Sequence, residues 1–315
     1  MAARGFRHEA LFYADEDSFL AGTLPFIREG VAAGEPVMVA ADTPKAELLR
    51  SRLNGSSERV EFVDMRALGR NPALILPIWR EFVAANAAGG SRLRGVGEPI
   101  WPERSPAEVV ECHHHESLLN LAFEDGPDWH LLCPYDRSAL SPSVLRGAAH
   151  NHPLIAEDGS KQPSHAYREP EETHAPFVGP LPDPPPTHRE VKFNSPGDLG
   201  SVRRFIAEHA ASIDDERADG LVLAVDEIAT NTLRHGGGTG RLRCWSENGA
   251  VVCEVSDAGT ITDPLVGRVL PDLSQPSGRG LWIANHFCDL VQIRSSSAGT
   301  VVRCRVDAVA APVPA

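Results

Sequence analysis

Hydrophobic positions in the first half of the chain fall into short apolar runs, separated by longer stretches in which an apolar residue recurs every three or four positions. The short runs are typical of buried strands, and the longer spacing is typical of amphipathic helices. Strands are predicted at 8–13, 35–41, 59–64, 92–98 and 129–136, with helices between them at 17–33, 44–53, 72–88 and 106–123. This alternation predicts a mostly parallel, doubly wound α/β sheet.

The second half has a different order of elements. One strand is followed by two helices, a hairpin, a short helix and a second hairpin. The first hairpin turns through Asn248-Gly249, and Asn-Gly between two β runs is a strong hairpin signal. The predicted strands are 190–194, 240–246, 250–256, 289–295 and 299–307, and the predicted helices are 198–212, 215–235 and 280–287. Helices segregated from antiparallel hairpins predict a two-layer α+β sandwich.

A proline-rich stretch separates the two halves. Residues 153–188 hold nine prolines and little periodic apolar sequence. That composition favours an extended, semi-rigid linker. We therefore expect a first domain at 1–158, a linker at 159–188 and a second domain at 189–308.

Composition narrows the class of protein. The 315 residues carry a formal net charge of −13, which argues against direct binding to nucleic acid or to an anionic membrane. The sequence has no apolar run long enough for a membrane-spanning helix and no signal-peptide pattern at its start. Its six cysteines do not have the spacing of a disulfide framework. A cytoplasmic location is the simplest expectation.

The stretch VDEIATNTLRHG, residues 225–236, places two polar side chains on one face of an otherwise apolar helix. Glu227 and Asn231 are four residues apart, which is about one helical turn. Such side chains are rarely buried without partners. This face therefore meets either water or a ligand that uses a carboxylate and an amide.

Two further motifs follow in order, and each suits part of a nucleotide. Asp257-Ala258-Gly259 ends a predicted strand, where an Asp can accept a hydrogen bond from an adenine amino group. Gly278-Arg279-Gly280 enters a predicted helix, where glycines let backbone N–H groups approach phosphate. The amide oxygen of Asn231 is a suitable ligand for Mg²⁺. Each motif alone also occurs in turns, helix caps or solvated faces, but the ordered set is more specific.

With these motifs, residues 190–307 resemble the GHKL (Bergerat-fold) ATPase superfamily and, within it, the anti-sigma-factor serine kinases. The stretches that carry the resemblance are VDEIATNTLRHG, DAG and SGRGLWIANHFCD. The resemblance implies a Bergerat-type sandwich that binds ATP and Mg²⁺. By the resemblance, Glu227 is the catalytic base, Asn231 binds Mg²⁺, Asp257 binds adenine, and Gly259, Gly278, Arg279 and Gly280 complete the nucleotide site.

The resemblance also implies partners, namely a sigma factor and an anti-anti-sigma protein that carries the target Ser or Thr, and it is compatible with a homodimer. Ile261 departs from the family pattern, because it stands where a second glycine is usual, and the lid at about 260–277 is short. Two alternatives stay open. One is a non-catalytic module that holds ATP to shape a sigma-binding surface. The other is a sensor histidine kinase, although no histidine with a dimerising helical hairpin precedes the ATP domain.

The first domain places polar residues where α/β sheets bind ligands, beyond the carboxyl ends of their strands and on a helix facing the sheet. Capping and packing explain them equally well. The candidate sensory-pocket residues are Tyr13, Glu98, Glu116, Asn120, Cys133, Tyr135 and Asp136. The half resembles the MEDS sensory domain, on the stretches LFYADEDSFLAGTLPFIREGVAAGEPVMVAA, GEPIW, HESLLNLAF and LLCPYD. The resemblance implies a module that senses a signal or a small-molecule effector.

The run Cys112-His113-His114-His115-Glu116 contains residue types that bind metals. Consecutive helical residues point about 100° apart, so only Cys112 with His115 or Glu116 can converge. Cys133 could join them from a strand. No second His/Cys pair has ligand spacing, and a helix with an exposed stripe of histidines is the favoured interpretation.

Overall fold

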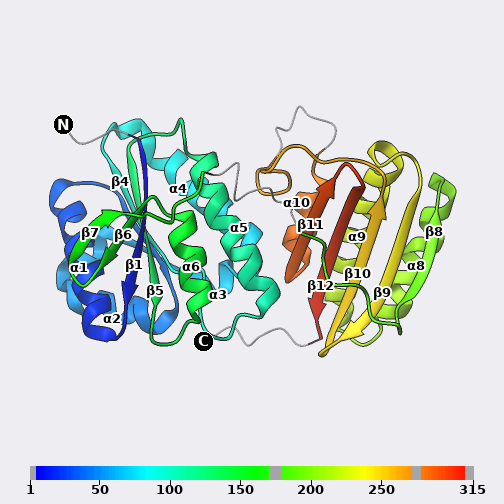
Figure 1. Cartoon of the computed structure of the whole chain (residues 1–315), viewed down its shortest axis with the longest axis horizontal. Helices are drawn as coiled ribbons and strands as arrows, with labels where there is room; N and C mark the ends of the chain where they lie inside the picture. The colour runs from blue at the N-terminus through cyan, green and yellow to red at the C-terminus, as the bar shows by residue number, and fades with distance from the viewer. Residues whose placement is uncertain (1–4, 170–178, 271–277, 309–315) are drawn as a thin grey trace. The chain divides into compact units, whose positions relative to one another are not determined.

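The computed structural model describes residues 5–169, 179–270 and 278–308. The chain divides into two compact units, Met1–Thr173 and His174–Ala315 (Figure 1). Each unit is built on one β-sheet.

The sheet of the first unit has seven strands in the order β3-β2-β4-β5-β1-β6-β7. Every neighbouring pair is parallel except β6 and β7, which are antiparallel. The strands are β1 (Phe6–Tyr13), β2 (Val37–Ala41), β3 (Val60–Asp64), β4 (Leu93–Gly97), β5 (Trp129–Asp136), β6 (Leu154–Glu157) and β7 (Ser160–Pro163). This arrangement confirms the predicted mostly parallel α/β sheet.

Helices cover both faces of this sheet (Figure 1). On one face the ring of Tyr13 contacts that of Phe19 in α1, with 5.2 Å between the centroids. On the other face Trp129 contacts Trp79 of α4 and Phe123 at the end of α5. The helices are α1 (Glu16–Ala33), α2 (Thr43–Leu53), α3 (Met65–Leu68), α4 (Ile75–Asn86), α5 (Pro106–Ala122) and α6 (Pro142–Asn151), with 3₁₀ turns η1 (Asn54–Arg59), η2 (Pro72–Leu74) and η3 (Ala87–Gly89).

Three elements at the end of this unit differ from the sequence prediction. Helix α6 and strands β6 and β7 were not predicted, and β7 falls inside the range 159–188 that was assigned to the linker. In β7, Lys161 pairs with Ala156 of β6, and its ammonium lies 2.9 Å from a carboxylate oxygen of Glu9. Sheet pairing and this ion pair therefore hold the start of the predicted linker against the α/β sheet.

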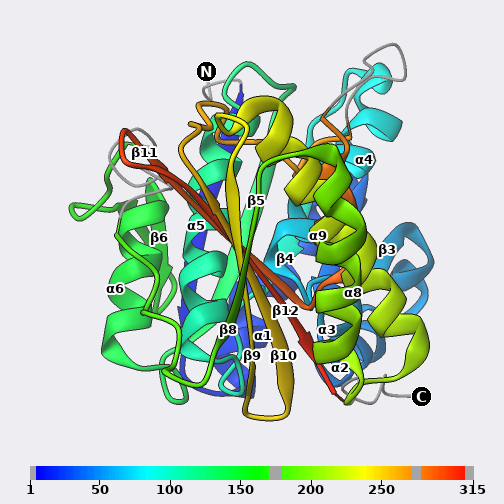
Figure 2. The same ribbon diagram turned by 90° about the vertical axis from the view of Figure 1, so that its right-hand side faces the viewer.

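The second unit has a five-stranded sheet in the order β11-β12-β10-β9-β8, with antiparallel pairing throughout. Figure 2 shows α8 and α9 together on one side of these strands. The strands are β8 (Arg189–Phe193), β9 (Gly240–Glu247), β10 (Ala250–Asp257), β11 (Leu290–Ser296) and β12 (Gly299–Asp307), and the helices are η4 (Pro196–Asp198), α8 (Leu199–Ala210), α9 (Asp215–His235) and α10 (Gly280–Phe287). The α+β sandwich predicted for this half is confirmed.

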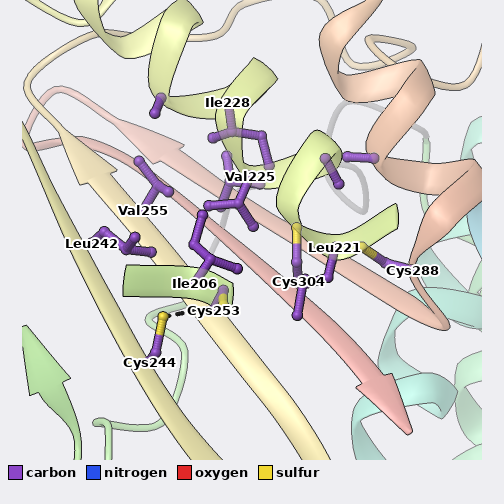
Figure 3. Packing of buried hydrophobic residues seen from close by; sticks show 14 of the residues in the cluster. Ile206, Leu221, Val225, Ile228, Leu242, Cys244, Cys253, Val255, Cys288 and Cys304 are labelled. Carbon is purple, nitrogen blue, oxygen red and sulfur yellow. Dashed lines mark hydrogen bonds between the residues drawn. The ribbon is translucent and has the colours of Figure 1, made fainter. Parts of the chain in front are cut away.

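The core of the second unit lies between the helices and the sheet. Ile206 of α8 and Val225 of α9 pack over strand residues such as Leu242 and Val255 (Figure 3). Four of the six cysteines, Cys244, Cys253, Cys288 and Cys304, belong to this core, and all six are buried and free. The cysteines of this sheet thus serve as small apolar side chains, which fits the absence of a disulfide framework in the sequence.

Candidate functional site

Helix α9 carries the first two candidate residues. Asp214 caps its N-terminus by accepting a hydrogen bond from the backbone N–H of Arg217 at 3.0 Å. Its first turn is acidic and its last turn is basic, which matches the helix dipole. Its apolar stripe is buried on the sheet, so Glu227 and Asn231 lie half-buried at the edge of that stripe.

The start of α10 lies directly against these two residues. A Cβ on Gly280 would be 2.6 Å from Asn231 Nδ2 and 3.3 Å from Glu227 Oε2, closer than ordinary packing allows. Glycine at this position therefore lets the backbone of α10 approach both side chains. The structure brings together Glu227, Asn231 and Gly280.

Asp257 is fixed in orientation at the end of β10. Its Oδ2 accepts a hydrogen bond from the Thr232 hydroxyl at 2.6 Å, and its Oδ1 accepts one from the Gly259 N–H at 2.8 Å. A Cβ on Gly236 would be 2.4 Å from the Asp257 carboxyl carbon, so the end of α9 can pass this close only as glycine. The carboxylate is thus held in one position with acceptor capacity left for a ligand.

A pocket of about 70 Å³ joins the α9 and β10 motifs. Asn231, Asp257 and Gly259 line it, together with apolar walls from Ile228 and Leu281. It is smaller than pockets that enclose a whole drug-sized ligand, so it can hold only part of such a ligand. A larger depression of about 1,080 Å³ also borders Asp257, but none of its described lining residues belongs to α9 or α10.

Ile261, which replaces the second glycine of the family pattern, lines the same pocket. Its backbone N–H donates a hydrogen bond to the Ser295 hydroxyl at 2.8 Å, so it is held against β11. The departure from the pattern therefore supplies an apolar wall and leaves the pocket in place.

Gly278 and Arg279 lie exposed immediately before α10. No side chain of the described residues caps this helix, and Gly278 has a φ of 103°. Uncapped backbone N–H groups at a helix start are a suitable place for an anion. Residues 271–277, which include most of the second half of the expected lid at 260–277, lie outside the described part of the chain.

Both halves match known families. Residues 7–153 match the MEDS domain, described as the MEthanogen/methylotroph, DcmR Sensory domain. Residues 194–306 match the histidine kinase-like ATPase domain. The chain joins a MEDS domain to a kinase-like ATPase domain. The ATPase match includes every candidate nucleotide residue from Glu227 to Gly280.

Among solved structures, the chain is similar to the crystal structure of the RsbU and RsbW domains of Rv1364c from Mycobacterium tuberculosis. The sequence identity is 18% and the TM-score is 0.30; the match covers 39% of this chain and 33% of the other. No curated protein matches the chain. Within the described ranges, no helix of either domain is both long enough and apolar enough to cross a bilayer.

In the MEDS domain the candidate pocket residues form two groups on opposite faces of the sheet. The first group lies beyond the carboxyl ends of the strands, on the face of the sheet that α1 covers. The Tyr13 hydroxyl donates to Glu98 Oε1 at 2.7 Å, and Lys45 Nζ donates to both Glu98 carboxylate oxygens at 2.7 Å. Asp136 pairs with Tyr13 in register, but its side chain closes a turn by accepting from Ser138.

Two pKa shifts accompany this first group. Burial, opposed by the neighbouring Lys45 ammonium, raises the pKa of the Glu98 carboxyl. Burial, together with the adjacent Glu98 carboxylate, raises the pKa of the Tyr13 hydroxyl. The ammonium of Lys45 is thus the group that makes an ionised Glu98 tolerable at this depth.

The second group lies under α5, on the face shared by Cys133 and Tyr135. It contains the candidate residues Glu116 and Cys133, together with His8 and His152. Asn120 contributes by accepting a hydrogen bond from His8 Nδ1 at 3.0 Å. Tyr135 is buried, with its ring 5.6 Å from that of His152. Burial, followed by the proximity of His152, lowers the pKa of His8 to about 4, so His8 is neutral at pH 7.

Of the run Cys112–Glu116, which contains metal-binding residue types, only Glu116 belongs to the second group. Cys112 and His113–His115 lie outside the second group, and the Cys112 thiol donates to the Pro99 carbonyl at 3.4 Å. Sequence reasoning missed His8 and His152. The only sequence signal for His8 is that it is a polar residue inside an apolar strand. His152 lies 144 positions further along the chain, next to helix α6, which was not predicted.

One stability prediction arises from the first group. Lys45→Met should destabilise the fold by about 1–3 kcal/mol near neutral pH, because Glu98 would keep its charge in a buried position without a cation. A carboxyl with a raised folded pKa binds its proton more tightly in the folded state, so folding is penalised fully above that pKa and not at all below the ordinary pKa of the unfolded chain. The deficit should therefore shrink as the pH falls through the folded pKa of Glu98 towards the ordinary value near 4.

Urea unfolding of the Lys45→Met and wild-type chains at a series of pH values measures this deficit. Lys192→Met, which changes an exposed lysine of the other unit, is the matched control and should cost little at any pH. A Lys45→Met deficit that is the same at every pH would show that Lys45 does not neutralise Glu98.

Proposed function

We propose that this chain is an ATP-dependent anti-sigma regulatory factor, a serine/threonine protein kinase that phosphorylates an anti-anti-sigma partner under control of its MEDS domain. The observation that carries the proposal is the convergence of Glu227, Asn231 and Gly280 at the junction of α9 and α10. A carboxylate that can act as base, an amide that can hold Mg²⁺ and a helix start that can receive phosphate are groups that phosphate transfer can use. The family matches support the kinase-like ATPase and sensory parts of this proposal.

The residues present fit ATP with Mg²⁺. Asp257, held by Thr232 and Gly259, would accept a hydrogen bond from the adenine amino group in the pocket that it lines. Asn231 would offer its amide oxygen to Mg²⁺, which neutralises phosphate charge when bound. The uncapped start of α10 would receive the phosphates.

Glu227 is placed to act on the attacking group. In the proposed reaction a Ser or Thr hydroxyl oxygen bonds to the γ-phosphorus, the bond to the ADP oxygen breaks, and the hydroxyl proton passes to the Glu227 carboxylate. Glu227 lies one helical turn before Asn231 on the same face of α9, which would put its carboxylate beside the phosphates. The rest of the catalysis would come from positioning and charge neutralisation.

Transfer of label from ATP tests the proposal. The full-length chain is incubated with γ-labelled ATP, Mg²⁺ and candidate anti-anti-sigma proteins. Acid-stable label on the partner is the expected result. Acid-labile label would instead indicate a histidine kinase, and ATP binding without transfer to any partner would indicate a non-catalytic module that shapes a sigma-binding surface.

A separate prediction concerns nucleotide affinity. Asn231→Ala should weaken Mg·ATP binding, by about 10-fold if the lost interaction is worth about 1.4 kcal/mol. The fold should be retained, because Ala is a better helix former than Asn. Calorimetry with and without Mg²⁺ measures the change, and the loss should be confined to the Mg²⁺ condition.

Asn194→Ala is the matched control, since Asn194 is exposed at the end of β8 and lines neither pocket. Its affinity for Mg·ATP should equal that of the wild-type chain. Equal affinity in Asn231→Ala as well would remove Asn231 from the nucleotide site.

A further inference from the structure

Four buried side chains of metal-binding type converge inside the MEDS domain. They are His8 on β1, Glu116 on α5, Cys133 on β5 and His152 directly after α6. One ligand atom from each lies within 4.8 Å of all the others, and each residue is at most 1% exposed. The four come from four different elements, so neither helical nor strand periodicity places them together. Their convergence is a property of the tertiary fold.

The spacing of these atoms is that of a small coordination shell. Glu116 Oε2 is 2.9 Å from His8 Nε2, 3.4 Å from His152 Nε2 and 3.7 Å from Cys133 Sγ. The distance from His8 Nε2 to Cys133 Sγ is 3.4 Å. A tetrahedral ion with bonds of about 2.0–2.3 Å holds its ligand atoms about 3.3–3.8 Å apart. Four of the six separations within the group are therefore close to those that one such ion imposes, and the other two are at most 4.8 Å.

Hydrogen bonds outside the group fix which imidazole nitrogen faces it. Asn120 Nδ2 donates to the Asn151 carbonyl at 2.8 Å, so Asn120 Oδ1 faces His8 and accepts from its Nδ1–H. His152 Nδ1 lies 2.7 Å from the Ala148 carbonyl, which can only accept. Each ring thus carries its proton on Nδ1 and, when neutral, turns a bare Nε2 lone pair towards the group. Such outer hydrogen bonds are characteristic of metal-binding histidines.

Without a cation the group is poorly satisfied. His152 Nε2 and Glu116 Oε1 are buried and have no hydrogen-bond partner in the described part of the chain. Two imidazole lone pairs face an oxygen that can itself only accept when ionised. Burying such a carboxylate without a compensating charge is costly. A divalent cation among the four ligand atoms would bind one electron pair from each of them and would compensate the charge of the carboxylate.

We propose that His8, Glu116, Cys133 and His152 bind one divalent transition-metal ion of the zinc class. Imidazole nitrogens and a thiolate favour zinc and its neighbours over Mg²⁺ or Ca²⁺, which prefer oxygen. On binding, the Cys133 thiol loses its proton to solvent, and the two anionic ligands neutralise the ion's two charges. The protein supplies all four ligands, as in a structural site, so the ion would tie β1, β5, α5 and α6 together.

Metal content of the full-length chain provides the test. After removal of metal with a chelator, the chain should bind one Zn²⁺ with a raised unfolding temperature. Co²⁺ should bind in its place and show a thiolate-to-metal charge-transfer band. Cys133→Ser should abolish that band, and Asn120→Ala should weaken binding by about 10–100-fold through loss of the outer hydrogen bond.

Controls separate this site from other thiols. Cys112→Ser changes a buried cysteine on the same α5 that lies outside the group, and Cys253→Ser changes the thiol that lies 3.1 Å from that of Cys244 in the ATPase domain. Both should keep the band and the affinity. If Cys133→Ser does not fold, His152→Gln replaces it, and this variant should bind Co²⁺ more weakly while keeping the band. No stoichiometric zinc in the wild-type chain, or an unchanged spectrum in folded Cys133→Ser, would overturn the proposal.

Discussion

Glu227→Gln should slow phosphate transfer to the partner by about 10²–10⁴-fold, the usual contribution of a positioned general base. Gln keeps the size and helix propensity of Glu, so the fold should be unchanged. Affinity for Mg·ATP should also be nearly unchanged, because Asn231, Asp257 and the start of α10 are left intact. The loss should therefore appear in the rate of the chemical step.

Single-turnover phosphorylation at saturating ATP measures this rate. Glu216→Gln is the matched control, because Glu216 is exposed in the first turn of the same helix and lines neither pocket. A Glu227→Gln rate within about threefold of wild type would remove Glu227 from the mechanism. A loss of ATP affinity equal to the loss of rate would assign Glu227 to binding.

Asp257→Asn should raise the dissociation constant for ATP by about 10–150-fold, which corresponds to the 1.5–3 kcal/mol of a hydrogen bond to a charged group. Asn can still accept from Gly259 and donate to Thr232, so the local structure should survive. It would, however, turn an amide N–H₂ towards the adenine amino group, where two donors face each other. Guanine carries a carbonyl oxygen at that position, so the preference for ATP over GTP should narrow.

Calorimetry with ATP and GTP in competition measures both the loss of ATP affinity and the change in the preference for ATP over GTP. Asp219→Asn, on the exposed side of α9, makes the same chemical change away from the pocket and should leave both affinities unchanged. An Asp257→Asn chain that binds ATP as well as wild type would place adenine elsewhere.

The elements of the ATPase domain were the most predictable from sequence, and local signals explain why. Helix α9 was expected at 215–235 and spans those residues, because an Asp caps its start and glycines follow its end. Strand β12 was expected at 299–307 and alternates buried with half-buried positions along its length. Helix α10 was expected at 280–287 and has the same bounds in the structure. In each of these elements the local sequence marks where the element begins and ends.

The end of the MEDS domain was less predictable. The Ser141-Pro142 pair, a typical cap and first residue, marks the start of α6, but the proline-rich composition that begins at Pro153 favoured a linker. Strands β6 and β7 are four residues each, and β7 is exposed throughout, so neither has a clear apolar pattern. Strand β6 pairs with β1, and β7 pairs with β6, and local sequence does not reveal either pairing.

The proposed nucleotide residues could be grouped from the sequence because their order along the chain is that of a known fold, whereas the order of the candidate sensory-pocket residues gave no such guide. All seven were expected near one pocket, yet adjacent strand positions face opposite sides of a sheet. Tyr135 and Asp136 are consecutive in β5 and therefore face different groups. His8 and His152 could be assigned to one of these groups only after the sheet order had placed β1 beside both β5 and β6.

The close approach at Gly280 has a consequence for how the ATPase domain tolerates change. Every possible substitution there adds at least a Cβ, which would meet the amide nitrogen of Asn231 at 2.6 Å. That amide is the end of a side chain, so it can move aside and the fold survives. The cost falls on the proposed Mg²⁺ ligand position that Asn231 vacates. In a mutational scan, substitutions of Gly280 should therefore lower activity while leaving the abundance of the protein nearly unchanged. That profile is usually expected of catalytic side chains, yet this residue has no side chain.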